Sequence, residues 1–439
     1  MGDLGLLMFP ALFALILTGF PIAFSLMCVA LVFGIMRFGD NAVNLFVARV
    51  DSVASNYVLG AVPLFILMGA LLERSGIAER LFDAIYMWTR KLPGGLAVGA
   101  ILMCTIFAAA SGIAGATETV VGLLAVPPML KYAYDKRLIA GTICAGGSLG
   151  TAIPPSITVI VLAPVANLPV GDLFAGIMLP GLVMAGLFFI YIITLCTLKP
   201  EMAPRDLVEL EDLPPMLERI KITLFALLPP VILIVAVLGT ILSGFATPTE
   251  GAACGALGAL IMSIIYRRLT VSVLMQALYN TSKITAMILL IVLGGQMFSG
   301  VFFASGGMGA VRGLLNDLGL EPWMVLALIL GLTFVLGFIL ELISVVLIII
   351  PIALPIVMGF GYDPLWFCVT FLVVLQTSYL TPPMAPAIFY FRAIAPPEIN
   401  LMHMYKGVIP FIIMQLITMA LVITFPGLTT WLPGVIYGN

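Results

Sequence analysis

The sequence predicts an all-helical protein that crosses a membrane several times and is built from two related halves. Of its 439 residues, 62% are hydrophobic and only 9% are charged, whereas a soluble protein needs a charged exterior. Runs of roughly 20 apolar residues, each long enough to span a bilayer as a helix, recur along the chain. The sequence does not show the alternating segments of roughly 10 residues that are typical of a transmembrane β-barrel.

A motif that occurs twice identifies the two halves. Tyr134-Asp135 precedes Pro154-Pro155, and Tyr362-Asp363 precedes Pro382-Pro383, at one common offset (362 − 134 = 382 − 154 = 228). Further matches follow in the same order, namely Leu17-Thr18-Gly19-Phe20 with Leu242-Ser243-Gly244-Phe245, and Ser75-Gly76 with Ser305-Gly306. Hydrophobic segments that Gly and Pro interrupt at matching places in two halves indicate a transporter built from structural repeats.

A single long polar stretch divides the chain. We assign residues 1–198 to a first repeat, 199–221 to a polar linker and 222–439 to a second repeat. Each repeat is expected to begin with three spanning helices, at about 4–18, 20–37 and 57–73 in the first and at about 222–243, 250–266 and 284–303 in the second. The basic residues of the linker, Lys199, Arg205, Arg219 and Lys221, place it in the cytoplasm. If the repeats are inverted, each crosses the membrane an odd number of times, and both termini are then periplasmic.

Two kinds of special segment follow in each repeat. The amphipathic segments 77–91 and 308–318 are typical of arm helices that lie along the membrane interface. The regions 108–169 and 336–395 contain the Pro-Pro pairs, which break a helix. Non-helical backbone at membrane depth occurs only where protein buries it or where it lines a polar cavity. Each repeat is therefore expected to hold a broken helix or a re-entrant hairpin, and periodicity does not tell which segment is the hairpin.

Five charged residues lie within or beside apolar runs, where charge is costly and usually functional. Glu250 follows Thr247 and is placed to cap a helix, and Lys283 is placed to extend to the interface. Glu118 and Glu341 are candidates for partners of hydroxyl groups or of a cation. Arg392 would pair with an organic anion or with a lipid phosphate.

Other chemistry is disfavoured by the composition. The only histidine is His403, and the six cysteines are not spaced as metal ligands, which argues against a membrane-embedded enzyme. No Walker-type nucleotide loop is present, so we expect no role for ATP. The net charge of −2 gives no sign of nucleic-acid binding. The hydroxyls and unwound carbonyls of the two broken regions instead suit a hard cation such as Na⁺.

Three motifs carry a resemblance to a known family. Gly-Ser-Leu-Gly-Thr-Ala-Ile-Pro-Pro-Ser-Ile at 147–157, Ala-Thr-Pro-Thr-Glu at 246–250 and Leu-Thr-Pro-Pro-Met at 380–384 resemble the large membrane subunit of the tripartite ATP-independent periplasmic (TRAP) transporters. The resemblance covers essentially the whole chain. It implies two inverted repeats with a scaffold domain and a transport domain, and an elevator-type, Na⁺-coupled import of a small organic acid anion. It also implies the bacterial inner membrane, a small four-helix membrane subunit and a soluble periplasmic substrate-binding protein.

The resemblance also implies the site residues. The first Na⁺ site would use Ser111, Gly150, Ile153 and Pro155, and the second would use Gly337, Ser378, Thr381 and Met384. The candidates for contact with the substrate are Arg392, Ser156, Glu118 and Glu341. The chain departs from its relatives at Ala114, where serine is frequent, and at Ser378, where glycine is common. An alternative of the same broad class is a stand-alone Na⁺/carboxylate symporter with two hairpins and no binding protein.

Overall fold

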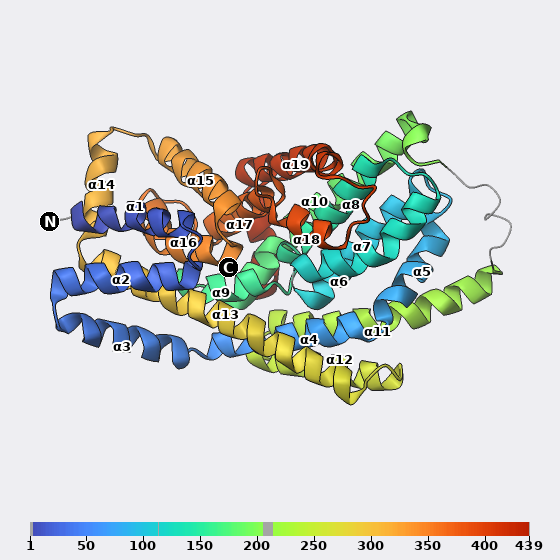
Figure 1. Cartoon of the computed structure of the whole chain (residues 1–439), viewed down its shortest axis with the longest axis horizontal. Coiled ribbons are helices and arrows are strands. Elements are labelled where there is room, and N and C mark those ends of the chain that lie inside the picture. Colours follow the sequence, from blue (N-terminus) through green and yellow to red (C-terminus); the bar gives the residue numbers. More distant parts are fainter. Residues whose placement is uncertain (1–2, 113, 205–213, 439) are drawn as a thin grey trace.

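The protein folds as a bundle of helices of very different lengths (Figure 1). The computed structural model describes residues 3–112, 114–204 and 214–438, and within these ranges it contains helices and connecting turns but no strand. Eight of the described helices are long and apolar enough to cross a membrane. The predicted all-helical fold is therefore confirmed, with eight candidate spans among the described helices.

The first half contains ten α-helices and two short 3₁₀ turns among its described residues. They are α1 (Asp3–Leu17), α2 (Ile22–Phe38), α3 (Asn41–Ala54), η1 (Tyr57–Gly60), α4 (Ala61–Arg74), α5 (Ile77–Thr89), α6 (Gly95–Ser111), α7 (Ala114–Lys131), α8 (Lys136–Ser148), η2 (Leu149–Thr151), α9 (Ile157–Ala166) and α10 (Val170–Leu198).

The second half follows after η3 (Pro200–Met202). Its helices are α11 (Met216–Leu242), α12 (Pro248–Ile265), α13 (Val271–Ala304), α14 (Gly307–Asp317), α15 (Pro322–Ile339), α16 (Leu342–Gly359), α17 (Pro364–Leu380), α18 (Pro386–Ile394), α19 (Leu401–Thr424) and α20 (Gly427–Tyr437). The order of short and long helices from α5 to α10 recurs from α14 to α19. The long α13 takes the place of α3, η1 and α4 together, since Val271 follows Asn41 by a similar offset (271 − 41 = 230).

The residues that the two halves share have the same local roles. Asp135 caps α8 by accepting a hydrogen bond from the Arg137 N–H at 2.7 Å, and Asp363 caps α17 by accepting one from the Trp366 N–H at 2.6 Å. Gly76 and Gly306 precede α5 and α14 with φ of 74° and 80°, a left-handed conformation that favours glycine. The repeated Tyr-Asp and Ser-Gly pairs thus mark equivalent helix starts.

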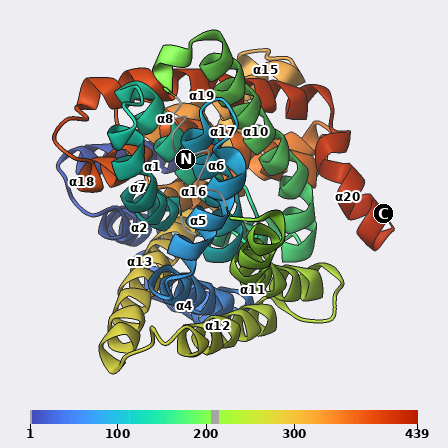
Figure 2. The same ribbon diagram turned by 90° about the vertical axis from the view of Figure 1, so that its right-hand side faces the viewer.

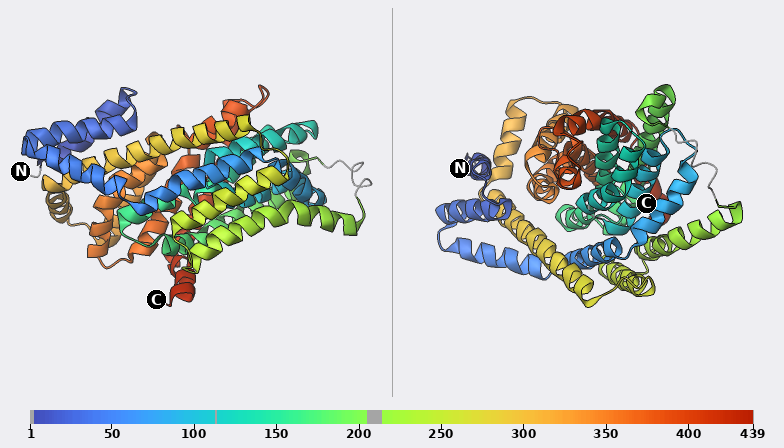
Figure 3. Two further views of the ribbon diagram at one scale, coloured as in Figure 1. Left: turned by 90° about the horizontal axis from the view of Figure 1, so that it is seen from below. Right: turned by 45° about the vertical axis from the view of Figure 1, so that its right-hand side comes forward.

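Long helices form a layer along one side of the molecule. α4 packs on α12 and α13, α11 packs on α12, and α2 and α3 pack on α13. In the end-on and turned views this layer lies beneath the remaining helices, which include α6 to α10 and α15 to α19 (Figures 2 and 3). The layer provides an extended surface against which the two broken regions rest.

Several boundaries differ from the expectation. α3 was not predicted, because Asn41, Asn44, Arg49 and Asp51 interrupt its apolar pattern. α13 begins at Val271 rather than near 284, because polar residues of its first turns, among them Gln276, are exposed and do not break the helix. α11 begins at Met216, so the end of the polar stretch is already helical. Part of that stretch, 205–213, lies outside the described residues.

Both amphipathic segments are helical, as predicted. α5 buries an apolar face that includes Ile77, Leu81 and Ile85 and packs on α6 and α11, whereas α14 buries only Gly307 and packs on α1 and α13. Their position along a membrane interface stays a prediction. The expected cap at Glu250 is confirmed, since Thr247 and Glu250 form a capping box at the start of α12.

Candidate functional site

The structure identifies which segments form hairpins. α6 ends at Ser111 and packs against α7, which begins at Ala114, and α15 ends at Ile339 and packs against α16, which begins at Leu342. The two Pro-Pro pairs lie elsewhere, in the breaks between α8 and α9 and between α17 and α18. Each half thus pairs one hairpin with one broken helix. The predicted boundaries near 108 and 336 fall inside the first limb of each hairpin.

The tip of the first hairpin rests on the first broken helix. Gly112 has a φ of 65°, and a Cβ atom added there would lie 2.6 Å from the carbonyl oxygen of Pro155. The Gly112 carbonyl accepts a hydrogen bond from the Ile157 N–H at 3.5 Å. Only glycine combines this backbone conformation with so close an approach. The contact brings Ser111 beside the break that also contains Gly150 and Ile153, so the first set of predicted ligands is gathered in one place.

Ser111 is fully buried beside this contact. Its hydroxyl lies 3.3 Å from the Thr117 hydroxyl, at hydrogen-bond distance across the hairpin tip. Ser156 directly precedes α9 and is also fully buried, and its hydroxyl has no hydrogen-bond partner among the described residues. An unpaired buried hydroxyl is uncommon in folded proteins. The first break therefore presents hydroxyl groups with free bonding capacity.

The second set of predicted ligands is also assembled by a close helix approach. A Cβ atom added at Gly337 would overlap the Ser378 hydroxyl and would lie 2.7 Å from the Ser378 Cβ. The hydroxyls of Ser378 and Thr381 donate to the carbonyls of Leu375 and Thr377, at 2.6 and 2.7 Å. Each hydroxyl oxygen keeps acceptor capacity for an ion. The last predicted ligand, the side chain of Met384, is 47% exposed.

The remaining candidates occupy different environments. Glu341 caps α16 by accepting hydrogen bonds from the N–H groups of Ile343 and Ser344, at 3.1 and 3.4 Å. Its carboxylate therefore stabilises the tip of the second hairpin. Arg392 is exposed in the last turn of α18, where it is available to an anion.

Glu118 lies on α7 and is completely enclosed, with 0% of its surface exposed. A Cβ atom added at Gly147 on α8 would overlap its side chain, so a glycine is needed there to admit the carboxyl group. Electrostatic contacts reach Glu118 from Cys104 and Cys144, and also from the phenol of Tyr379 on α17. Neither Glu118 oxygen has a well-formed hydrogen bond to the described residues, and the Tyr379 hydroxyl has none either.

The two halves interlock around this position. The ring of Tyr390 on α18 covers Gly115 on α7, where an added Cβ atom would lie 2.7 Å from it. On the neighbouring α8, the Ser148 hydroxyl accepts a hydrogen bond at 3.2 Å from the side-chain amide of Gln415, on α19. Sequence reasoning had singled out Glu118 but missed Gly147, Tyr379 and Gln415. Only the intramembrane position of Tyr379, between two predicted ligands, could have drawn attention to it.

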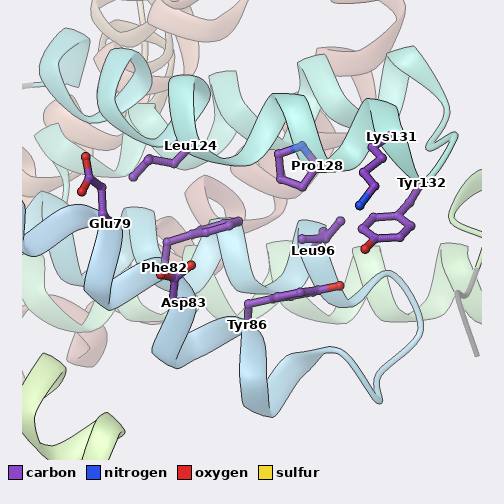
Figure 4. A pocket seen from close by; sticks show the side chains of 9 residues that line it. All are labelled: Glu79, Phe82, Asp83, Tyr86, Leu96, Leu124, Pro128, Lys131 and Tyr132. Atoms are coloured by element: carbon purple, nitrogen blue, oxygen red, sulfur yellow. The ribbon is translucent and has the colours of Figure 1, made fainter. Parts of the chain in front are cut away.

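A cavity of about 400 Å³ lies between α5 and the hairpin (Figure 4). It is lined by Glu79, Phe82, Asp83, Tyr86, Leu96, Leu124, Pro128, Lys131 and Tyr132. Desolvation raises the pKa of the Asp83 carboxyl above its ordinary value, and the nearby Glu79 carboxylate adds to the effect. Glu79 also forms an exposed ion pair with Arg268 at 3.4 Å. The cavity lies beside the contact of the predicted first arm with α6, where α5 faces the other limb of the hairpin, α7.

The fold and its paired hairpins define a class, that of polytopic membrane transporter subunits. Residues 9–428 match the family model of the "Tripartite ATP-independent periplasmic transporter, DctM component". The chain therefore belongs to this family, as the large membrane subunit of a TRAP transporter, and the family resemblance of its motifs is confirmed.

Similar proteins extend over nearly the full length of the chain. The C4-dicarboxylate TRAP transporter large permease protein DctM of Pseudomonas aeruginosa is 31% identical, over 91% of this chain and 91% of its own. The sialic acid permease SiaM of Vibrio cholerae is 29% identical, over 97% of each chain. The ectoine permease TeaC of Halomonas elongata is 30% identical, over 97% of this chain and 98% of its own.

A solved structure has a similar fold. The crystal structure of the YdaH transporter of Alcanivorax borkumensis matches with a TM-score of 0.65 and 16% identity, over 92% of this chain and 96% of that chain. At this identity the likeness concerns the fold alone.

Proposed function

We propose that this chain is the permease of a Na⁺-coupled, binding-protein-dependent importer of a small organic acid anion. The observation that carries the proposal is the membership of the TRAP family together with the two gathered sets of hydroxyls and broken backbone. Relatives are named for C4-dicarboxylates, sialic acid and ectoine, so the proposal names the class of a small carboxylate or sulfonate. The family membership favours this function over a stand-alone symporter.

The coupling ion would bind where each hairpin tip meets a broken helix. We assign Ser111, Gly150, Ile153 and Pro155 to a first Na⁺ site. We assign Gly337, Ser378, Thr381 and Met384 to a second. Hydroxyl and carbonyl oxygens are the donors that a hard, partly dehydrated cation prefers, and both breaks supply them. Arg392, Ser156 and Glu341 are the candidates for contact with the anion, whereas Glu118 is enclosed.

The proposed partners follow from the tripartite family. A small four-helix membrane subunit would bind the scaffold, and a soluble periplasmic protein would deliver the anion. The permease would lie in the bacterial inner membrane, with its linker in the cytoplasm and both termini in the periplasm, as the positive-inside rule indicates. Isolation of the chain from its native membrane tests this arrangement, because the small subunit should co-purify with it.

The proposed mechanism is an elevator movement of the hairpins and broken helices within a fixed scaffold. The recurring order of α5 to α10 and α14 to α19 supports two structural repeats, and their inverted orientation is part of the proposal. We assign the arms α5 and α14 to the scaffold, because interfacial helices anchor at one depth. We add α13, because it packs on α2, α3 and α4 in the layer of long helices. Gly295 on α13 faces Leu347 on the hairpin helix α16, and a Cβ atom added at Gly295 would lie 2.7 Å from the Leu347 Cβ. The Cβ atoms of a disulfide lie roughly 3.5–4.5 Å apart, so α13 and α16 must shift apart by about 1 Å for cysteines at these two positions to join. The disulfide should stop uptake relative to the reduced double variant, and reduction should restore it. Full uptake after complete cross-linking would contradict the movement.

The experiment that tests the function uses all three components in proteoliposomes. Uptake of succinate, sialic acid, ectoine and a sulfonate should be compared under an inward Na⁺ gradient, without ATP. We expect uptake of a compound only with the binding protein and with Na⁺. Undiminished uptake with K⁺ in place of Na⁺, at matched membrane potential, would refute the coupling. Uptake without a binding protein would favour the stand-alone symporter.

A further inference from the structure

The carboxyl group of Glu118 lies where no described group neutralises it. The side chain is completely buried, and neither of its oxygens has a hydrogen bond of good geometry to the described residues, and the neutral phenol of Tyr379 is the one side chain placed to donate to it. An ionised carboxylate buried without a partner is among the least favourable arrangements in a protein. Such a group persists only if it is neutral or if it binds a cation.

The surroundings of Glu118 favour a proton over a metal ion. The titratable groups that face it are the thiols of Cys104 on α6 and Cys144 on α8, and the phenols of Tyr379 on α17 and Tyr390 on α18. Thiols are soft donors that do not suit Na⁺. The described residues contain no group of three or more His, Cys, Asp and Glu side chains that could hold a metal.

The neighbouring helix α8 leaves a space that the Glu118 side chain fills. Gly147 leaves the room that the Glu118 side chain takes up, and even an alanine there would overlap it. The carboxyl group also reaches from the first hairpin to Tyr379, which lies next to Ser378 in the second broken helix. A change in the charge of Glu118 would therefore affect both the first hairpin and the second broken helix.

We propose that Glu118 is an internal proton site through which this transporter couples import to H⁺ as well as to Na⁺. The proposal rests on the proposed transport function. In the enclosed state Glu118 is a neutral carboxylic acid. In addition to the shared elevator movement, a local opening of α7 from α17 and α18 lets water reach the group, which releases its proton to one side of the membrane and becomes a carboxylate. On return to the other side it takes up a proton before it is enclosed again, so that no other reactant is needed.

Infrared difference spectroscopy of the full chain with its small subunit, in lipid nanodiscs, tests the protonation directly. The spectrum of the wild type minus that of Glu118→Gln, at neutral pH, should contain the C=O stretching band of a protonated carboxylic acid. The spectrum of the wild type minus that of Glu250→Gln, which changes an exposed capping residue, should lack it. Glu118→Asp should give a shifted band. Absence of the band from the first difference spectrum would overturn the proposal, whatever the transported compound.

Proton flux tests the coupling. Proteoliposomes of the complete system should contain a pH-sensitive dye, with succinate as the probe anion and an inward Na⁺ gradient. We expect internal acidification with the wild type, and a lower ratio of protons to succinate taken up in Glu118→Gln, whatever its rate of uptake. Equal ratios in the two proteins, or succinate uptake by the wild type without acidification, would overturn the coupling. If succinate is not taken up at all, the infrared result still decides the proton site, and the proposed substrate class alone is weakened.

Discussion

Replacement of Gly337 by alanine should loosen the second hairpin from the second broken helix. The added Cβ atom would overlap the Ser378 hydroxyl and lie 2.7 Å from the Ser378 Cβ, which is well inside ordinary carbon contact. α15 and α17 must then separate locally. Overpacking of this kind costs about 1–3 kcal/mol. Since Gly337 and Ser378 are both proposed ligands, binding of Na⁺ should weaken as well.

A matched control lies on the same helix. Gly331 on α15 has no atom within 4 Å of an added Cβ atom, so Gly331→Ala gains only the better helix propensity of alanine, up to about 1 kcal/mol. Comparison of the two variants removes the propensity effect, and we expect Gly337→Ala to be about 1–3 kcal/mol less stable than Gly331→Ala. The double variant Gly337→Ala/Ser378→Gly should recover most of the loss, because it removes both colliding atoms.

The assay is reversible unfolding in mixed micelles, followed by tryptophan fluorescence and repeated with and without Na⁺. An ion that binds only the folded state raises the free energy of unfolding by RT ln(1 + c/Kd), where c is the Na⁺ concentration, so tighter binding gives a larger gain. The Na⁺-dependent gain should be smaller in Gly337→Ala than in Gly331→Ala. Equal stability of the two variants would refute the close approach of α15 and α17, and so would a failure of Ser378→Gly to rescue.

Three further outcomes are expected. Thr381→Val should raise the Na⁺ concentration for half-maximal uptake while saturating Na⁺ restores much of the rate, whereas Arg392→Gln should weaken uptake at every Na⁺ level; an unchanged Na⁺ titration would remove Thr381 from the ion site. The raised pKa of Asp83 means that the folded state binds its proton more tightly, so the ionised group lowers stability at neutral pH. Asp83→Asn should therefore be more stable than the wild type at neutral pH, and this difference should vanish as the pH falls below the ordinary carboxyl range. Thermal unfolding of both proteins over a series of pH values measures the difference, and a growing advantage at low pH would contradict the reasoning. Glu79→Gln should leave thermal stability almost unchanged, because its ion pair with Arg268 has side chains 58% and 59% exposed and such pairs contribute about 0–1 kcal/mol; a large loss would show that the pair has a structural role.

The sequence could predict features that depend on local chemistry. Pro-Pro pairs break helices wherever they occur, and Asp135 and Asp363 cap helices in both halves through bonds to residues two or three positions away. These features need no knowledge of the tertiary fold. The paired offsets then place equivalent breaks in both halves.

The sequence could not predict which distant helices pack against one another. The hairpin limbs could not be told from the broken helices, because α6 and the part of α8 after Arg137 are both runs of apolar and small residues that almost entirely become buried. The enclosure of Glu118 depends on Gly147 and Tyr379, from two other helices. The same apolar pattern would suit many partners, so only the folded chain shows which glycine admits which side chain.

The interlocking of the halves also bears on how the protein is made. The hydrogen bond from Gln415 to Ser148 joins residues 267 positions apart, and Tyr379 and Tyr390 are made equally late relative to Glu118. At a synthesis rate of roughly 5–20 residues per second, the first half waits for roughly 13–53 seconds before its polar groups are covered. During that interval α7 and α8 lie in the membrane without their partners. A ribosome that stalls beyond the linker would therefore release a fragment with an uncovered carboxyl group in the bilayer, a natural target for membrane quality control.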